Sequence, residues 1–193
     1  MHQLKECIAT HIQIKAETLN TIVSAFEAFS ISKGSFLLES GKLANQLIFI
    51  ASGYVRMYDI SDGKEITLWI GSKGKFITSV SSFVFKTTNY WNIQAITDCE
   101  IYAISRENHF SLCQQQPKWL EFDNLLLANS FALLEQKMFS HLHTTAKQRF
   151  EKLLQEEPAL FNHVPLQYIA SMLGITPESL SRLRKGIGTN PNS

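Results

Sequence analysis

The sequence contains little cysteine. Its 193 residues include three cysteines, Cys7, Cys99 and Cys113, which are far apart along the chain. An odd number of scattered cysteines does not suggest a disulfide framework, and an iron–sulfur cluster needs four thiolate ligands. We therefore predict reduced thiols, as in a cytoplasmic protein, and no iron–sulfur centre.

Long apolar runs and an excess of one charge are also lacking. No stretch stays apolar over the length of a membrane span, and the first residues lack the apolar core of a signal peptide. We expect a soluble cytoplasmic protein that does not contact a membrane. The formal net charge is only +1, so any affinity for nucleic acid must come from a local basic cluster.

Motifs for catalysis and for metal binding are missing as well. The six histidines are scattered, and His141 and His143 stand two apart on a predicted helix, whereas helical metal pairs stand three or four apart. The sequence has no nucleophile elbow and no glycine-rich phosphate loop. We predict no enzyme, no catalytic residue and no metal ligand.

The N-terminal two thirds of the chain combine helical and strand patterns. Apolar residues recur at helical intervals over residues 3–29, interrupted near Lys15, which predicts two short helices. Short apolar runs separated by turn formers follow, and Asp62-Gly63 is a strong hairpin signal. Many short strands at regular spacing predict a β-sandwich or barrel. The predicted strands are residues 36–38, 47–50, 54–58, 66–70, 92–96 and 100–104.

A long helix is predicted over residues 117–143, after a shorter one over residues 106–116. Its apolar residues follow alternating steps of four and three, which is typical of a seam between two helices. We predict a homodimer through this seam. The alternative is that both faces of the helix are buried within one subunit. The predicted interface residues are Leu120, Asn124, Leu127, Phe131, Leu134 and Met138.

Two short helices joined by a tight turn are predicted near the C-terminus. Gly174 follows the first helix, and Thr176 and Pro177 begin the second. The second helix presents hydrogen-bond donors and acceptors suited to the major groove of DNA. The predicted DNA-binding residues are Thr176, Glu178, Ser179, Ser181, Arg182, Arg184 and Lys185. The alternative is a small helical packing unit with a solvated polar face.

Residues 169–182, IASMLGITPESLSR, resemble the helix-turn-helix of Crp/Fnr-family transcription regulators. The resemblance implies that Glu178 and Arg182 read bases. Pro177 replaces a further family arginine, so the operator sequence of well-known members does not carry over. The resemblance also implies double-stranded DNA and RNA polymerase as partners.

Residues 47–56, LIFIASGYVR, together with residues 74–77 and 98–101, are similar to the cyclic nucleotide-binding β-roll of the same family. Where the family has a Gly-Glu pair this chain has Thr78-Ser79, and the family's Arg-Ser pair falls near Asn89-Tyr90. A buried phosphate needs a cation or converging N–H groups, and Lys86 is the nearby cation. We therefore predict an unidentified small effector that is not a cyclic nucleotide, and no certain cofactor. The candidate effector residues are Thr78, Ser79, Ser81, Ser82, Lys86, Asn89, Tyr90 and Trp91, the alternative being a hydroxyl-rich loop over a filled roll.

These patterns predict an α+β protein with a double-stranded, jelly-roll-like β-roll as sensor. The expected units are the roll at residues 1–116, the dimerisation helix at 117–143 and the helix-turn-helix unit at 144–193. The interval between Pro158 and Pro165 is too short for a full β-hairpin wing, so we expect a winged-helix-like unit with the wing reduced or absent. Residues 186–193 are expected to form a flexible tail. The predicted function is effector-controlled regulation of transcription. The alternative is a ligand sensor that acts through protein contacts without specific DNA binding.

Overall fold

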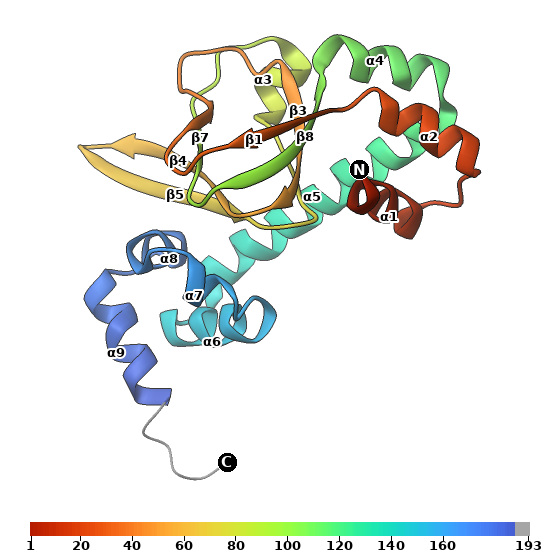
Figure 1. The fold of residues 1–193 in the computed structure, drawn as a ribbon. Helices are drawn as coiled ribbons and strands as arrows, with labels where there is room; N and C mark the ends of the chain where they lie inside the picture. Colours follow the sequence, from red (N-terminus) through yellow and green to blue (C-terminus); the bar gives the residue numbers. More distant parts are fainter. Residues whose placement is uncertain (188–193) are drawn as a thin grey trace.

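A computed structural model describes residues 1–187 of the chain (Figure 1). It begins with α1 (His2–His11) and α2 (Ala16–Ser24), so the predicted break near Lys15 is confirmed. The second helix ends earlier than expected, because Glu27–Ile31 forms strand β1. This segment pairs along its whole length with β8, from Glu27 opposite Ala103 to Ile31 opposite Cys99. Pairing with a distant strand thus outweighs the local helical pattern.

The roll consists of two four-stranded antiparallel sheets, with strand orders β1-β8-β3-β6 and β2-β7-β4-β5. The predicted double-stranded β-roll is confirmed. Apolar side chains from both sheets, including Ile50, Val55 and Ile93, are buried between them. The remaining strands are β2 (Phe36–Leu38), β3 (Gln46–Ser52), β4 (Val55–Ser61), β5 (Lys64–Gly71), β6 (Phe76–Ile77), β7 (Asn92–Ala95) and β8 (Cys99–Ser105).

The hairpin between β4 and β5 turns at Asp62 and Gly63. Their φ angles are 50° and 72°, and the flanking residues Ser61 and Lys64 are paired. Two consecutive residues with positive φ are the hallmark of the two-residue turn that the Asp-Gly pair predicted.

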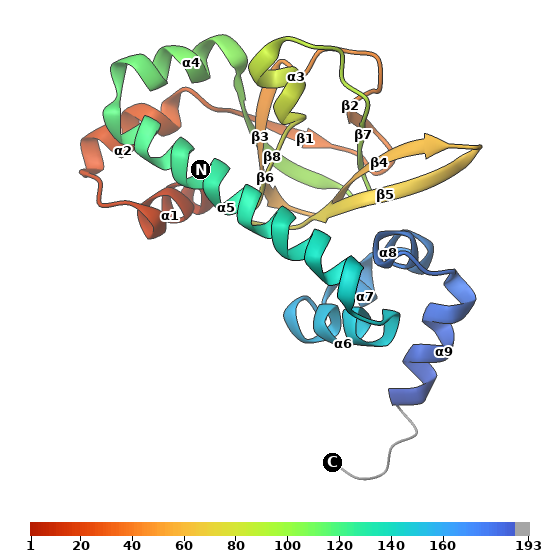
Figure 2. The same ribbon diagram turned by 180° about the vertical axis from the view of Figure 1, so that it is seen from behind.

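Helix α5 (Pro117–His143) has the bounds expected from the sequence. It follows α4 (Arg106–Gln115) and passes from α1 and α2 to the C-terminal helices (Figure 2). At its N-terminal end Trp119 and Phe122 are fully buried in a core that also includes Leu4, Ile8 and Phe49. A further helix of the roll, α3 (Val80–Phe85), lies within residues 78–91, the stretch for which an effector site or a hydroxyl-rich loop was considered.

The C-terminal helices are α6 (Ala146–Glu156), α7 (Leu160–His163), α8 (Leu166–Leu173) and α9 (Pro177–Ile187). Thr145 and Gln148 form a capping box at the start of α6. Helix α7 occupies the interval between α6 and α8, and residues 144–187 include no strand. Helix α9 runs on through Gly186 and Ile187, which were expected in the tail. The rest of that predicted tail, residues 188–193, lies outside the described residues.

The roll and the C-terminal helices share an apolar core. Ile70 and Ile96 of the roll pack with Phe150, Leu160 and Ile169 of the C-terminal helices. None of the helices in residues 1–187 combines the length and apolar character required of a bilayer-spanning segment.

Candidate DNA-binding helix, effector cavity and dimer face

The turn between α8 and α9 has the backbone hydrogen bonds of a Schellman motif. Gly174 adopts φ 70°, its N–H donates to the carbonyl of Ser171 (3.0 Å), and the N–H of Ile175 donates to the carbonyl of Ala170 (3.0 Å). Thr176 then caps α9, because its Oγ1 accepts a hydrogen bond from the N–H of Ser179 (3.2 Å). This geometry fixes the direction in which α9 leaves the turn.

The outer face of α9 carries the predicted DNA-binding residues, and Figure 1 shows α9 on the side of the C-terminal unit away from the roll. Thr176, Glu178, Arg182, Arg184 and Lys185 are exposed, and Ser179 and Ser181 are half-buried. All seven therefore lie on α9 or at its cap. In the middle of the helix, Leu180 is fully buried against α8.

The two side chains expected to read bases are held in place locally. The Nη2 of Arg182 donates to Oγ of Ser179 (3.2 Å). The pKa of the Glu178 carboxyl is lowered, first by its own backbone N–H, then by the Thr176 hydroxyl and by the charge of Arg182. Glu178 is consequently a carboxylate at the positive end of the helix dipole.

Arg149 connects the end of α5 to this turn. Its Nη1 donates to the carbonyl of Thr144 (2.6 Å), and its Nε and Nη2 both donate to the carbonyl of Leu173 (3.2 and 3.0 Å). Thr144 is the C-cap of α5 and Leu173 is the last residue of α8. One side chain thus links the long helix to the helix-turn-helix.

Helix α8 covers the free edge of β5, the last strand of its sheet. The N–H of Thr67 donates to Oγ of Ser171 (2.9 Å), whose hydroxyl donates to the carbonyl of Glu65 (3.3 Å). Lys137 of α5 donates to the carbonyl of Leu68, the extra residue in a β-bulge opposite β4. Side chains from two helices thereby provide hydrogen-bond partners for backbone groups at the edge of the sheet.

A buried arginine lies at the same contact. Arg56 is 2% exposed and is held by Glu65 (2.6 Å) and Gln94 (3.1 Å). Its guanidinium carbon lies 3.8 Å from the ring centroid of Tyr58 and 3.7 Å from that of Tyr168. A cation of the roll is therefore stacked between one aromatic ring from the roll and one from α8.

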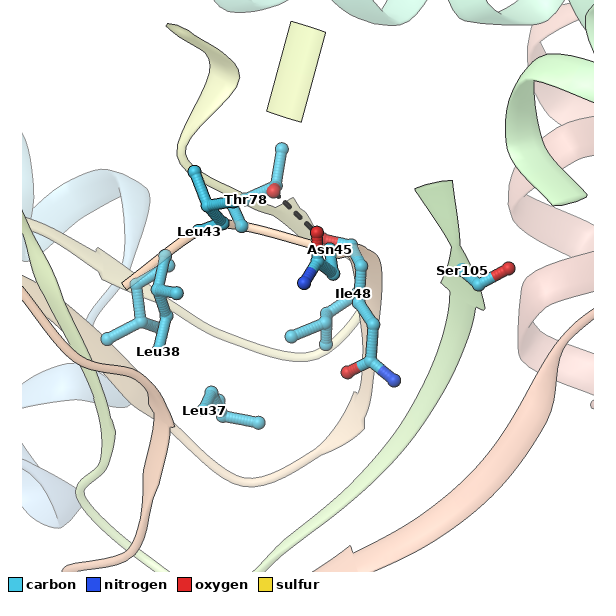
Figure 3. A pocket seen from close by; sticks show the side chains of 10 residues that line it. Leu37, Leu38, Leu43, Asn45, Ile48, Thr78 and Ser105 are labelled. Carbon is cyan, nitrogen blue, oxygen red and sulfur yellow. Dashed lines mark hydrogen bonds between the residues drawn. The ribbon is translucent and has the colours of Figure 1, made fainter. Parts of the chain in front are cut away.

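A cavity of about 280 Å³ lies between the two sheets of the roll. Figure 3 shows Leu38, Leu43 and Ile48 facing a common space, with Ser105 pointing away from it. Thr78 lies at the rim and donates to the carbonyl of Gln46 (2.8 Å). The ten lining residues are all uncharged: Leu37, Leu38, Leu43, Ala44, Asn45, Gln46, Ile48, Thr78, Ile93 and Ser105.

Of the eight candidate effector residues, Thr78 lines this cavity and the other seven do not. Ser82 is buried, and its Oγ accepts from the N–H of Ala44 (2.9 Å). The buried Asn89 side chain is bonded to the backbone of Trp91 and to the carbonyl of Glu39 (3.1 Å). These groups hold α3 and its following loop in place. Ser79 is also buried, Trp91 is partly buried, and Ser81, Lys86 and Tyr90 are exposed.

The predicted dimer seam is exposed along α5. Its six residues, Leu120, Asn124, Leu127, Phe131, Leu134 and Met138, are exposed in the single chain, with Phe131 at 63%. Beyond the seam, Leu125, Leu133, Phe139 and Leu142 are exposed too. Exposed apolar surfaces on folded proteins are often contact sites for a partner, and the dimer seam stays a prediction.

A polar cluster that the sequence analysis missed joins α4 to α5. His109 Nε2 lies 3.6 Å from Asp123 Oδ2 and 3.7 Å from Cys113 Sγ. His109 and Cys113 stand four apart on a predicted helix, a spacing that could have revealed the pair. Asp123, on the next helix, could not be placed beside them from the sequence.

Comparison with known proteins gives a consistent picture of the fold. The family model of the cyclic nucleotide-binding domain matches residues 28–116. FixK2 from Bradyrhizobium japonicum is 18% identical over 85% of this chain and 85% of that chain, with a TM-score of 0.74. The c-di-GMP-responsive global regulator CLP from Xanthomonas campestris is 20% identical over 90% of this chain and 92% of that chain (TM-score 0.70).

A Crp/Fnr-family transcriptional regulator from Eubacterium rectale is 19% identical over 91% of this chain and 84% of that chain, with a TM-score of 0.69. At these identities the likeness establishes the fold. A comparison with curated proteins finds no match.

Proposed function

We propose that this chain, which has the Crp/Fnr fold with a cyclic nucleotide-binding-type domain at residues 28–116, is a dimeric DNA-binding transcription regulator controlled by a small effector. The observation that carries the proposal is the exposed face of α9. Over residues 177–187 it has three cations, Arg182, Arg184 and Lys185, against one carboxylate, Glu178. This local excess of two positive charges is the basic cluster that a nearly neutral chain needs to bind DNA.

The geometry of α9 suits reading of the major groove. Glu178 and Arg182 stand four apart and so lie on one face of the helix. A glutamate accepts a hydrogen bond from the amino group of cytosine, and an arginine donates two to guanine. Arg182 and Ser179 share a hydrogen bond in the free protein, which orients the guanidinium before DNA arrives. Ordering it on binding therefore costs little additional side-chain entropy.

The second copy in the proposed dimer packs along the exposed apolar face of α5. A single recognition helix reads few base pairs, whereas a two-fold dimer places two such helices on successive half-sites. Leu127, Phe131 and Leu134 would be covered, which removes apolar surface from water at about 25 cal/mol per Å². Asn124 would fix the register of the seam at some cost in stability. A DNA-bound dimer of this kind would also contact RNA polymerase.

We further propose that the effector is small, uncharged and mostly apolar. The cavity in the roll has about 280 Å³ and no charged lining residue, so a phosphate placed there would lose its hydration without a compensating cation. Asn45, Gln46 and Thr78 supply hydrogen-bonding groups to orient such a ligand. The β5 strand of the same roll contacts α8 through Ser171 and α5 through Lys137, which offers a short route from the roll to the DNA-binding helix.

Selection from a pool of random double-stranded DNA tests the regulator proposal. The full chain should enrich a two-fold symmetric sequence over successive rounds. The double variant Glu178→Ala/Arg182→Ala should lose that enrichment. The control Lys73→Ala/Glu17→Ala, which removes one exposed charge of each sign away from α5 and α9, should keep it. A folded wild-type chain that enriches no sequence would favour the alternative of a sensor acting through protein contacts.

Native mass spectrometry of the purified chain tests the effector proposal. We expect a copurifying neutral molecule of low mass. Leu43→Trp, which fills the cavity from a half-exposed position, should abolish the mass increment, whereas Ile60→Trp on the exposed hairpin should not. A bound cyclic nucleotide would contradict the assignment of an uncharged ligand.

A further inference from the structure

The cluster of His109, Cys113 and Asp123 has the composition and spacing of a metal site. One ligand atom from each residue lies within 4.8 Å of the other two. His109 Nε2 is 3.6 Å from the carboxylate of Asp123 and 3.7 Å from the sulfur of Cys113. In a tetrahedral site with bonds of about 2.0–2.3 Å, neighbouring ligand atoms stand roughly 3.3–3.7 Å apart. Both separations are close to that spacing.

The surroundings of the cluster are apolar and aromatic. His109 is 3% exposed, and its ring makes edge contacts with Phe83, Phe110 and Trp119 at centroid distances of 5.2, 5.0 and 5.6 Å. Cys113 and Asp123 are partly exposed, so the cluster is open to solvent on their side. A site with apolar residues on one side and solvent on the other leaves a bound metal one free coordination position.

Two buried polar groups beside the cluster lack regular partners. His109 Nδ1 and Trp119 Nε1 have no regular hydrogen-bond partner among residues 1–187. The indole N–H of Trp119 nevertheless interacts with the thiol of Cys113. A metal-bound thiolate would be a stronger acceptor for this N–H than a thiol is.

We propose that His109 Nε2, Cys113 Sγ and Asp123 Oδ2 bind one divalent transition-metal ion of the zinc type, with a fourth position open to water or a ligand. Thiolate and imidazole donors favour zinc, cobalt, nickel or copper over magnesium and calcium, which prefer all-oxygen sites. An iron–sulfur cluster does not fit, because Cys7 and Cys99 lie outside the cluster and it supplies a single thiolate. Binding releases the proton of the Cys113 thiol.

Such an ion would join two helices with different roles. His109 and Cys113 belong to α4, next to the roll, whereas Asp123 belongs to α5, which continues to the C-terminal helices (Figure 2). The ion would fix the angle between them. Because no acceptor in the described part of the chain bonds to His109 Nδ1, we expect an affinity roughly 10–100-fold below that of zinc sites with a complete outer shell.

Cobalt titration of the full chain, stripped of metal with a chelator, tests this site. We expect one Co²⁺ per chain, visible bands of tetrahedral intensity, a thiolate-to-cobalt charge-transfer band, and displacement of Co²⁺ by Zn²⁺ but not by Mg²⁺. Cys113→Ser should remove the charge-transfer band, and Asp123→Asn should weaken binding at least tenfold. The matched control Cys7→Ser should leave spectrum and affinity unchanged.

Circular dichroism of each variant shows whether the chain remains folded. His109→Gln is the variant with the greatest risk of misfolding, because His109 is buried. The test of the metal site therefore rests on Cys113→Ser and Asp123→Asn. Absence of stoichiometric Co²⁺ binding by the wild-type chain would overturn the proposal. A charge-transfer band that survives in folded Cys113→Ser would overturn it equally. Neither result depends on whether the chain binds DNA.

Discussion

The guanidinium carbon of Arg56 lies 3.7 Å from the ring centroid of Tyr168, so a buried cation of the roll stacks directly on the first helix of the helix-turn-helix. Ser171, one turn further along α8, bonds to both Thr67 and Glu65 on the edge of β5. The position of α8 and α9 relative to the roll is therefore set by specific polar contacts as well as by apolar packing.

Loosening this contact should be visible in amide exchange. Tyr168→Ala removes a desolvated cation–π contact worth up to about 2 kcal/mol, and Ser171→Ala removes the acceptor of the Thr67 N–H. Each should speed exchange of the Thr67 amide by roughly 5–30-fold, the factor that corresponds to 1–2 kcal/mol. Ser181→Ala on α9 serves as the control. Unchanged Thr67 exchange in Ser171→Ala would show that α8 does not protect the strand edge.

Arg182 should carry sequence discrimination and Lys185 mainly affinity. Arg182→Ala should cost about 1–3 kcal/mol at a selected operator and flatten preference at one base position, because a bidentate base contact is lost. Lys185→Ala should weaken binding to all sequences alike and lower the salt slope by about one per subunit. Fluorescence anisotropy across a salt series measures both. An unchanged base preference in folded Arg182→Ala would show that α9 does not recognise the base sequence.

A charge in the α5 seam should weaken self-association. Leu134→Lys or Leu127→Lys would place an unpaired charge in the interface, which is costly because desolvation is not compensated. Asn129→Lys, at an exposed position outside the seam, is the matched control. Analytical ultracentrifugation should show monomers for the seam variants and dimers for wild type and control. A wild-type chain that stays monomeric at micromolar concentration would rule out this interface.

Gly53 and Gly63 should respond differently to alanine. Both have positive φ (88° and 72°), but a Cβ at Gly53 would stand 2.5 Å from the carbonyl oxygen of Asp98, whereas a Cβ at Gly63 meets nothing within 4 Å. Gly63→Ala should cost about 1–2 kcal/mol from backbone strain alone. Gly53→Ala adds a backbone clash and should cost at least about 3 kcal/mol. Urea unfolding of both variants checks the difference, and equal losses would contradict it.

Lys137 should make stability depend on alkaline pH. Burial lowers the pKa of its ammonium from the ordinary value of 10.5 to about 8. Between these values the unfolded chain binds more protons than the folded one, so this group makes the free energy of unfolding rise with pH. Below pH 8 both states are protonated and the cost of burying the charge is complete.

Comparison with Lys137→Met isolates this effect. Between pH 7 and pH 10.5 the free energy of unfolding of wild type should rise by on the order of 1–3 kcal/mol relative to that of the variant. This figure is reduced for the partial exposure of the side chain. Burial and the charge of Asp123 raise the pKa of Cys113 to about 11, which acts in the opposite direction. That contribution is common to both proteins and cancels in the difference. Parallel pH profiles of the two proteins would contradict the lowered pKa.

Several elements could be predicted because their signals lie in a few neighbouring residues. The bounds of α5 were marked by Pro117, because proline fits the first turn of a helix, and by Thr144-Thr145, because threonine caps the next helix. Asp62-Gly63 marked the β4–β5 hairpin, and Gly174 marked the turn before α9, because both turns need positive φ. The resemblance to Crp/Fnr regulators then indicated how these elements are assembled.

Other features could be found only in the folded chain, because they depend on residues far apart in the sequence. Residues 27–31 are a strand because β8 lies beside them. Ser82 and Asn89 form buried hydrogen bonds within the chain because Ala44 and Glu39 meet them there. The residues that line the cavity are up to 68 positions apart in the sequence, from Leu37 to Ser105. Likewise, Asp123 joins His109 and Cys113 only because α5 packs on α4. Local propensity contains no information about such pairings, since each depends on which surfaces the folded chain brings into contact.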